Sequence, residues 1–399
     1  VMKKQTILLM VCSAVFAASS QTWIRKSDFP GTARMTAASF SMGDKGYVGT
    51  GCNGSGNISD FWEYNALNDQ WTQKADFTGA ARCEAVGVSA GDKGYIGTGE
   101  TDSSLTNDLF EYIPANDTWV QKTSLPAANR HKAVAFKIGT KIYAGTGTDG
   151  LSYYKDFWEY DPVSDTWSQK ADFAGNPRIS ATGFGIGNKG YLGLGFGTNG
   201  EYRQDFFEYD PNANWWYRIP DDFPGAGRED AVFVGVDALG KGYLACGFKS
   251  LTTYLSDVWE YNQATQEWKP LGAFSGVGRR GAAGFVINNT LYIGLGKDAA
   301  GNYLKDFWAF TLPTAIAGVN EMTHTVSPNP VTTRLTVEVS AMQAMFTLFD
   351  ISGRKAVAQM LVNGKNSILL ETLPAGTYYY VLKNSAGKND AWGKLIKIP

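Results

Sequence analysis

The stretch GYVGTG, at Gly46–Gly51, decides the fold because close copies of it occur five more times along the chain. A second stretch, DFWEY at Asp60–Tyr64, recurs with the same interval and ends as DFWAF at Asp306–Phe310. Self-similarity at a period near 48 residues predicts a solenoid, a propeller or an array. The tyrosines of the first stretch are separated by 48, 48, 48, 52 and 49 residues and are Tyr47, Tyr95, Tyr143, Tyr191, Tyr243 and Tyr292.

Each unit contains four short candidate strands separated by Gly, Asn and Asp turns. The first is small and apolar, the second and third are the two repeated stretches, and the fourth opens with a tryptophan. Short strands rich in aromatic residues with such turns are typical of antiparallel sheets. Four strands in each of six units predict an all-β, six-bladed β-propeller.

The tryptophans indicate how the ring closes. Trp23 stands alone before the first unit, whereas the sixth aromatic stretch has no tryptophan after it. We therefore expect Gln21–Asp28 to supply the outer strand of the last blade and to cover an edge that would otherwise be exposed. The tryptophans that open a fourth strand are Trp71, Trp119, Trp167, Trp216 and Trp268.

These features, over roughly Gln21 to Leu312, resemble the kelch repeat in its six-bladed form. The resemblance rests on the aliphatic–Tyr stretch, the aromatic strand, the spaced tryptophan and an arginine placed 13 residues before the tyrosine, or 15 in the fifth unit. The sequence departs from the family where a double glycine is replaced by Gly-x-Gly. The recurring arginines are Arg34, Arg82, Arg130, Arg178, Arg228 and Arg279.

The two ends of the chain have a different character. Residues 1–20 read as a secretory signal, with Lys3 and Lys4 before a short apolar run and a small-residue cleavage site. After the propeller at 21–311 and a linker at 312–326, residues 327–399 predict a small β-sandwich. Its motifs SPNP, DISGR, LPAGTY and KLIK, in that order, resemble the C-terminal sorting domain of type IX secretion cargo.

The sorting resemblance implies the type IX secretion machinery as a partner. It also implies export from a Gram-negative bacterium, with release or attachment at the cell surface and possible removal of the domain. A carbohydrate-binding or immunoglobulin-like appendage is the alternative. Residues 5–326 contain 26 basic and 34 acidic residues, so nonspecific nucleic-acid binding is not expected. Beyond the signal no apolar stretch is long enough for a transmembrane segment.

The repeated arginines should lie on one face with the loops that vary most between units. In a four-stranded meander, the loop between strands two and three and the connection to the next blade share a face. Guanidinium groups there suit planar polar ligands. The structural alternative is ion pairing inside each blade, for which we expect these partners: Glu63, Glu111, Glu159, Glu208 and Glu260. Tyrosines in the variable loops, able to stack on sugar or peptide, are Tyr153, Tyr154, Tyr202, Tyr254 and Tyr303.

The residues directly after each arginine differ between units and are not demanded by the blade. This places Glu84, His131, Glu229, Asp230 and Arg280 near the mouth of the channel as candidate ligand-binding residues. A carboxylate and a histidine there suit acid–base chemistry, and ordinary solvated charges are the alternative.

No cofactor or metal is expected from the inventory of residues. The chain has two histidines, His131 and His324, too few for the copper site of galactose oxidase-type kelch propellers or for zinc at ligand spacing. Three cysteines follow the signal: Cys52, Cys83 and Cys246. A Cys52–Cys83 disulfide is one interpretation, and small buried thiols are the other.

The sequence thus favours an exported binding module for a glycan or a protein, without catalytic residues that can be named. One alternative is an epimerase resembling the six-bladed kelch mutarotases that act on acidic sugars such as sialic acid. The other is a structural or adhesion component of the cell surface.

Overall fold

The computed structural model describes residues 22–250, 252–313, 324–384 and 389–399. The chain divides into two compact units, Val1–Leu312 and Pro313–Pro399. The predicted signal at 1–20, and residues 314–323 of the predicted linker, lie outside the described residues.

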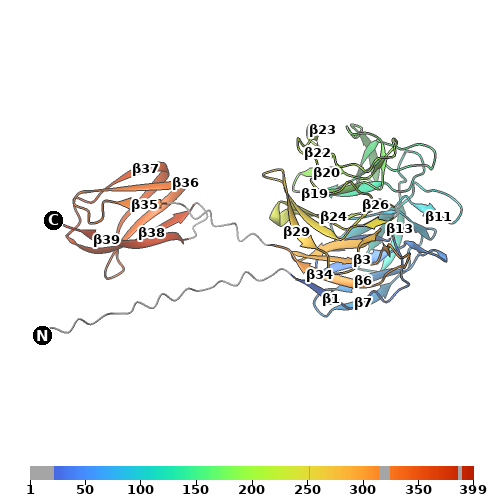
Figure 1. Ribbon diagram of the computed structural model, residues 1–399, viewed down its shortest axis with the longest axis horizontal. Helices are drawn as coiled ribbons and strands as arrows, with labels where there is room; N and C mark the ends of the chain where they lie inside the picture. The colour runs from blue at the N-terminus through green and yellow to red at the C-terminus, as the bar shows by residue number, and fades with distance from the viewer. Residues whose placement is uncertain (1–21, 251, 314–323, 385–388) are drawn as a thin grey trace. The chain divides into compact units, whose positions relative to one another are not determined.

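The first unit consists of six antiparallel four-stranded sheets, and the prediction of a six-bladed propeller is confirmed (Figure 1). Each blade uses the strands expected from the repeat, in sequence order from the inner strand outward. Blade 1 is β2 (Ala38–Met42), β3 (Lys45–Gly49), β6 (Phe61–Asn65) and β7 (Gln70–Lys74). Blade 2 is β9 (Val86–Ala90), β10 (Lys93–Gly97), β12 (Leu109–Ile113) and β13 (Thr118–Lys122). Blade 3 is β14 (Val134–Ile138), β15 (Lys141–Gly145), β16 (Phe157–Asp161) and β17 (Thr166–Lys170). Blade 4 is β19 (Thr182–Ile186), β20 (Lys189–Gly193), β22 (Phe206–Asp210) and β23 (Trp215–Arg218); blade 5 is β24 (Val232–Val236), β25 (Lys241–Ala245), β28 (Asp257–Asn262) and β29 (Glu267–Ala273).

Blade 6 is completed by the N-terminal strand, as predicted. β31 (Ala283–Ile287), β32 (Thr290–Gly294) and β34 (Phe307–Thr311) come from the end of the unit, and β1 (Trp23–Lys26) is the outer strand. β1 lies antiparallel beside β34 with Trp23 opposite Phe310 (Figure 1). The Trp23 ring packs 4.7 Å from that of Phe274 and 4.9 Å from that of Phe310. The two ends of the propeller sequence therefore close the ring.

Aromatic side chains join neighbouring blades because small residues leave room for them. The ring of Phe40, on the inner strand of blade 1, packs so near β10 that a Cβ on Gly94 would lie 2.3 Å from it. Phe61 stacks on Tyr47 within blade 1 and meets Tyr112 of blade 2 at 4.8 Å between ring centroids. These rings are fully or almost fully buried, so the blade interfaces are the core of the unit.

The loop arrangement expected from strand counting is confirmed. β8 (Arg82–Cys83), which precedes the inner strand of blade 2, pairs with β11 (Glu100–Thr101), which follows the second strand. Both classes of loop therefore lie on one face, called the loop face here. The other short pairs are β18 (Arg178–Ile179) with β21 (Phe196–Gly197), β30 (Arg279–Arg280) with β33 (Lys297–Asp298), β26 (Phe248–Ser250) with β27 (Thr253–Tyr254), and β4 (Cys52–Asn53) with β5 (Gly56–Asn57).

The longer spacing in the fifth unit has a structural cause. The turn between β24 and β25 contains the 3₁₀ helix η1 (Asp237–Leu239), which ends at Gly240 with φ 61°. The two extra residues before Tyr243 therefore enlarge one turn on the face opposite the loop face. No helix of the described residues is long and apolar enough to cross a membrane.

The second unit is a small sheet structure with one apolar core, built mainly from residues such as Leu335, Phe346, Leu361 and Leu382. The first part of β36 pairs with β35 and its second part with β38. β35 begins at His324, so residues 324–326 belong to a strand, not to the predicted linker. Its strands are β35 (His324–Ser327), β36 (Arg334–Asp350), β37 (Lys355–Leu369), β38 (Gly376–Asn384) and β39 (Asn389–Lys397).

Candidate functional site

The six repeated arginines are completely enclosed by their own blades. Each is at most 1 % exposed and forms a two-pronged ion pair with the aspartate that precedes the third strand. The Nη2–Oδ2 distances are 2.7 to 2.9 Å. The pairs are Arg34–Asp60, Arg82–Asp108, Arg130–Asp156, Arg178–Asp205, Arg228–Asp257 and Arg279–Asp306.

The prediction that the repeated glutamates pair with these arginines is therefore wrong. The glutamates accept hydrogen bonds from the repeated tyrosines instead, as from Tyr47 to Glu63 at 2.8 Å and from Tyr95 to Glu111 at 2.7 Å. The aspartate lies at the loop-face end of its strand, where the arginine is, whereas the glutamate lies three residues further along. The same tyrosine–glutamate bond is made by Glu159, Glu208 and Glu260.

The remaining guanidinium hydrogens are directed to the backbone. Arg34 donates to the carbonyls of Thr32 and Thr50, and the equivalent bonds recur in all six blades. Five of the six guanidinium groups also lie over a phenylalanine, and Arg130 lies over Tyr154. These arginines, which the sequence predicted as candidate ligand-binding residues, form ion pairs and hydrogen bonds inside their blades. The site described below does not include them.

The Gly-x-Gly departure from the kelch pattern lies at a blade junction. Gly51 donates its N–H to the carbonyl of Arg82 in the next blade at 2.8 Å, and its φ of 92° favours glycine. Thr50 before it also has a positive φ, 59°. The same bond links all six junctions and so forms a closed ring on the loop face: Gly51, Gly99, Gly147, Gly195, Gly247 and Gly296 donate.

A second ring of backbone bonds surrounds the channel mouth, formed by the second residue after each arginine. These residues all have left-handed φ values between 47° and 59°, and five of the six blade-to-blade N–H to O=C bonds are present. Among these described residues, only the bond from Glu84 to Thr36 is not formed. The ring is therefore open between blades 1 and 2. Its members are Thr36, Glu84, Lys132, Ser180, Asp230 and Gly281.

The side chains around this ring form an asymmetric charged group at the mouth. Arg280 Nε lies 3.1 Å from Asp230 Oδ2, and Lys132 Nζ lies 3.7 Å from Glu84 Oε1. Burial, followed by the negative charge of Asp230, raises the pKa of Glu229 to about 7. The structure thus brings together Glu84, Glu229, Asp230 and Arg280, all of which the sequence placed near the mouth, and His131 adjoins them.

A row of aromatic side chains borders the charged group on blades 4 and 5. The ring of Tyr202 lies 5.0 Å from Phe196 and 6.1 Å from Phe248, and Phe248 lies 5.1 Å from Tyr254. The guanidinium of Arg280 stands over Phe248 at 4.7 Å. We call Phe196, Tyr202, Phe248 and Tyr254 the aromatic row. Both tyrosines are partly exposed, so they offer ring surface to a ligand.

The other predicted tyrosines do not join this row. Tyr154 donates a hydrogen bond to Asp149 at 2.8 Å and covers Arg130, and Tyr303 lies under the ammonium group of Lys297. Tyr153 pairs with Thr148 in a short bridge. Sequence reasoning missed Lys132, Glu100 and Phe248 as parts of the mouth. Lys132 and Glu100 depart from their counterparts in the other units, which was the signal used for Glu84, whereas Phe248 has the same residue type as its counterpart Phe196.

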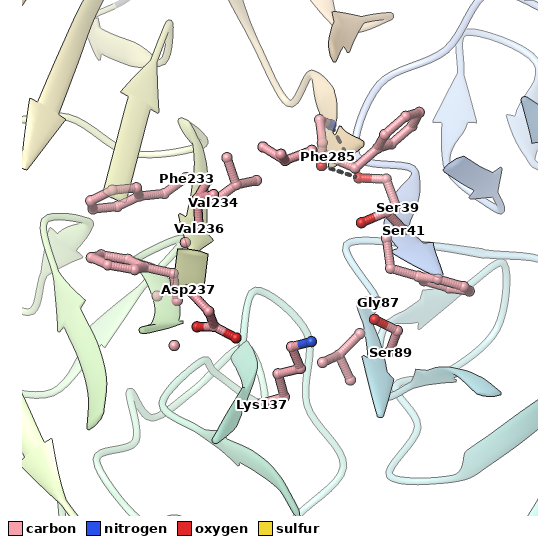
Figure 2. Close-up of a pocket in the computed structure, with 18 of the residues that line it drawn as sticks. Ser39, Ser41, Gly87, Ser89, Lys137, Phe233, Val234, Val236, Asp237 and Phe285 are labelled. Carbon is pink, nitrogen blue, oxygen red and sulfur yellow. Dashed lines mark hydrogen bonds between the residues drawn. The ribbon is translucent and has the colours of Figure 1, made fainter. Parts of the chain in front are cut away.

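The channel continues below the mouth to the opposite face. Its upper part, of about 180 Å³, is lined by alanines such as Ala85 and Ala133. The lower part, of about 350 Å³, is drawn in Figure 2, where the side chains of Asp237 and Lys137 lie near each other at the rim of the opening. Asp237 Oδ1 also accepts the N–H of Gly187 at 2.9 Å, so η1 places a carboxylate at this end.

Comparison with known proteins agrees with both parts of the chain. The "Secretion system C-terminal sorting domain" family matches residues 325–397, and the "Kelch motif" family matches residues 130–173. The solved structure of YjhT is 19 % identical, with a TM-score of 0.63, and the match covers 73 % of this chain and 98 % of that chain. No curated protein matches the chain.

Six closed blades, each tied by a buried arginine–aspartate pair, define a kelch-type β-propeller. The chain is a kelch-repeat propeller protein with a C-terminal sorting domain of type IX secretion, and the sorting domain marks it as exported.

Proposed function

We propose that this protein is an exported binding module that holds a neutral, hydroxyl-rich glycan at the mouth on the loop face. The observation that carries the proposal is the aromatic row beside Arg280, Asp230 and Glu229. Exposed aromatic rings provide apolar surface for the faces of sugar rings, while carboxylates and guanidinium groups provide acceptors and donors for hydroxyls.

The charge of the mouth supports a neutral ligand over an acidic sugar. The six repeated arginines are buried and paired within their blades, so they are not accessible to a ligand carboxylate at the mouth. The cations at the mouth are Arg280 and Lys132, and both lie near carboxylates. With Glu84, Glu100, Glu229 and Asp230 close by, an added anion would meet net negative charge.

Binding to a glycan array should depend on the aromatic row. We expect the full chain to bind neutral oligosaccharides, and Tyr202→Ala or Tyr254→Ala to weaken binding about tenfold, which corresponds to about 1.4 kcal/mol. Tyr217→Ala is the matched control, because Tyr217 is an exposed tyrosine on the outer strand β23. Isothermal titration with the best sugar gives the affinities. A silent array, or equal affinities for all three variants, would contradict the proposal.

The same proposal includes where the protein acts. The predicted signal at residues 1–20 supports passage across the inner membrane, and the sorting domain supports export by the type IX machinery. We propose that the mature protein is secreted from, or attached to the surface of, a Gram-negative bacterium, where soluble and cell-wall glycans are accessible.

A second candidate function is sugar epimerisation at the same mouth, and the observation that favours it is the pKa of Glu229. A buried carboxyl with a pKa of about 7 is suited to general-base catalysis near neutral pH. In this mechanism Glu229 accepts the proton of the anomeric hydroxyl while the bond from the anomeric carbon to the ring oxygen breaks and the ring oxygen takes a proton from water. The reverse transfers close the ring on either face of the carbonyl.

Anomer exchange followed by NMR tests this second candidate. The exchange rate above the buffer background should rise as pH increases through about 7, because only the ionised Glu229 carboxylate is a base. Glu229→Gln should abolish the excess rate, whereas Tyr217→Ala should leave it unchanged. An excess rate that survives in Glu229→Gln, or no excess in the wild type, excludes catalysis by this residue.

A further inference from the structure

Four side chains with metal-binding atoms meet beside the opening in the second backbone ring. β8 and β11 pair so that Cys83 lies opposite Glu100, and Glu84 follows Cys83 directly. His131 reaches them from the equivalent position of blade 3. The residues come from three separate segments of the chain, so no short sequence motif predicts the cluster.

Their potential ligand atoms converge on one small volume. Sγ of Cys83 and one carboxylate oxygen each from Glu84 and Glu100 lie within 4.8 Å of one another. Nδ1 of His131 lies 2.7 Å from Glu84 Oε2 and 3.2 Å from Glu100 Oε2. Atoms held tetrahedrally around zinc at ~2.0–2.3 Å are themselves roughly 3.3–3.7 Å apart. His131 Nδ1 is near this spacing from both glutamates, but it lies outside the group within 4.8 Å, so His131 and the Cys83 sulfur must move closer together to share an ion.

Two of these atoms are buried and face each other. Glu84 Oε2 and His131 Nδ1 are shielded from solvent and lie 2.7 Å apart, so each is the other's partner. The side chains of Glu84 and His131 are 12 % and 13 % exposed. Buried polar atoms are normally satisfied, and this pair is satisfied while a proton lies between the two atoms, so a metal ion bound there would take the place of that proton.

We propose that Cys83, Glu84, Glu100 and His131 bind one Zn²⁺ ion between blades 2 and 3. A donor set of one thiolate, one imidazole and two carboxylates suits zinc, whereas calcium and magnesium select oxygen atoms alone. Four protein donors complete a tetrahedral site, so the ion is structural and ties Glu84 to blade 3. The expectation of no metal, based on histidine number and linear spacing, missed this cluster because blade pairing assembles it.

The thiol of Cys52 is the main competitor for Cys83. Cys52 lies in β4 within hydrogen-bond reach of the Cys83 thiol, and a disulfide between them would remove the sulfur ligand. The proposal therefore requires Cys83 to remain a thiol when metal is bound. The zinc proposal is independent of the glycan proposal, which rests on the aromatic row.

Metal titration of the full chain tests the site. Protein reduced and then freed of metal by chelation should bind one equivalent of Zn²⁺, and Co²⁺ in its place should give a thiolate-to-cobalt charge-transfer band. At about a hundredfold excess over Kd, Zn²⁺ should raise the Tm by about 5 °C or more. Cys83→Ser should lose the band, and both Cys83→Ser and His131→Gln should weaken Zn²⁺ binding by at least about a hundredfold.

Two cysteine variants serve as controls. Cys52→Ser cannot form the disulfide and should keep the Co²⁺ band, and Cys246→Ser should also keep it, because Cys246 is buried in blade 5. Circular dichroism checks that each variant is folded. If Cys83→Ser does not fold, His131→Gln still tests whether the cluster binds zinc. Substoichiometric zinc in Cys52→Ser, or Co²⁺ binding without a thiolate band, would overturn the proposal.

Discussion

Arg178→Met should lower the free energy of unfolding by about 3–5 kcal/mol, and the Tm by roughly 10 °C, because it leaves Asp205 without its partner inside blade 4. The guanidinium makes two bonds to Asp205, one to the carbonyl of Leu194 and one to that of Asn176. Methionine fills a similar volume but leaves all of these acceptors unsatisfied. Thermal unfolding monitored by circular dichroism measures the change.

The matched control is Arg218→Met, which breaks the ion pair with Asp222. That pair is about half exposed at both ends, so its loss should cost less than about 1 kcal/mol. The double variant Arg178→Met/Asp205→Leu should recover part of the loss, because it removes the unpaired carboxylate together with the arginine. If Arg178→Met unfolds within a degree or two of Arg218→Met, the arginines are not structural ties.

The repeat predicted the ring, the strand order and the closing strand, because these follow from spacing alone. It did not identify the partner of the arginines, although Asp60 has counterparts in all six units and Glu63 in only five, with Ala309 at its position in the sixth. Position along the strand gives the physical reason: Asp60 is at the loop-face end, and Glu63 lies opposite Tyr47 in the pairing of β3 with β6. The sixth unit therefore already favoured the aspartate, and strand register explains why.

The mouth was predicted in part because departures from a repeat mark positions that the scaffold does not need. Glu84, His131, Glu229 and Asp230 were found in this way. Arg280 was found in the same way, but its pairing with Asp230 was not, because that contact joins two neighbouring blades. Two loop pairings and one blade junction bring Cys83, Glu100 and His131 together. No spacing of residues along the sequence predicts these contacts.

Removal of the N-terminal strand should open the propeller at blade 6. β1 pairs with β34 over four residues, and Ser27 joins the strand to blade 1 by donating its N–H to Asp69 and accepting from Trp71 Nε1, both at 3.1 Å. The same bonds from Ala75 to Asp117 and from Trp119 to Ala75 join blades 1 and 2, so the closing strand reproduces an ordinary blade junction.

Deletion of residues 21–28 loses these bonds and leaves β34 as an uncovered edge beside Phe274 and Phe310. We expect a decrease in Tm of about 10 °C or more, together with concentration-dependent aggregation through the exposed edge. Trp23→Ala alone should cost about 2–4 kcal/mol, since its ring packs on both phenylalanines. Trp215→Ala is the control, because Trp215 is an exposed tryptophan on the outer strand of blade 4. Differential scanning calorimetry and light scattering measure the two effects, and a deletion variant that melts like the wild type and stays monomeric would show that blade 6 is stable with three strands.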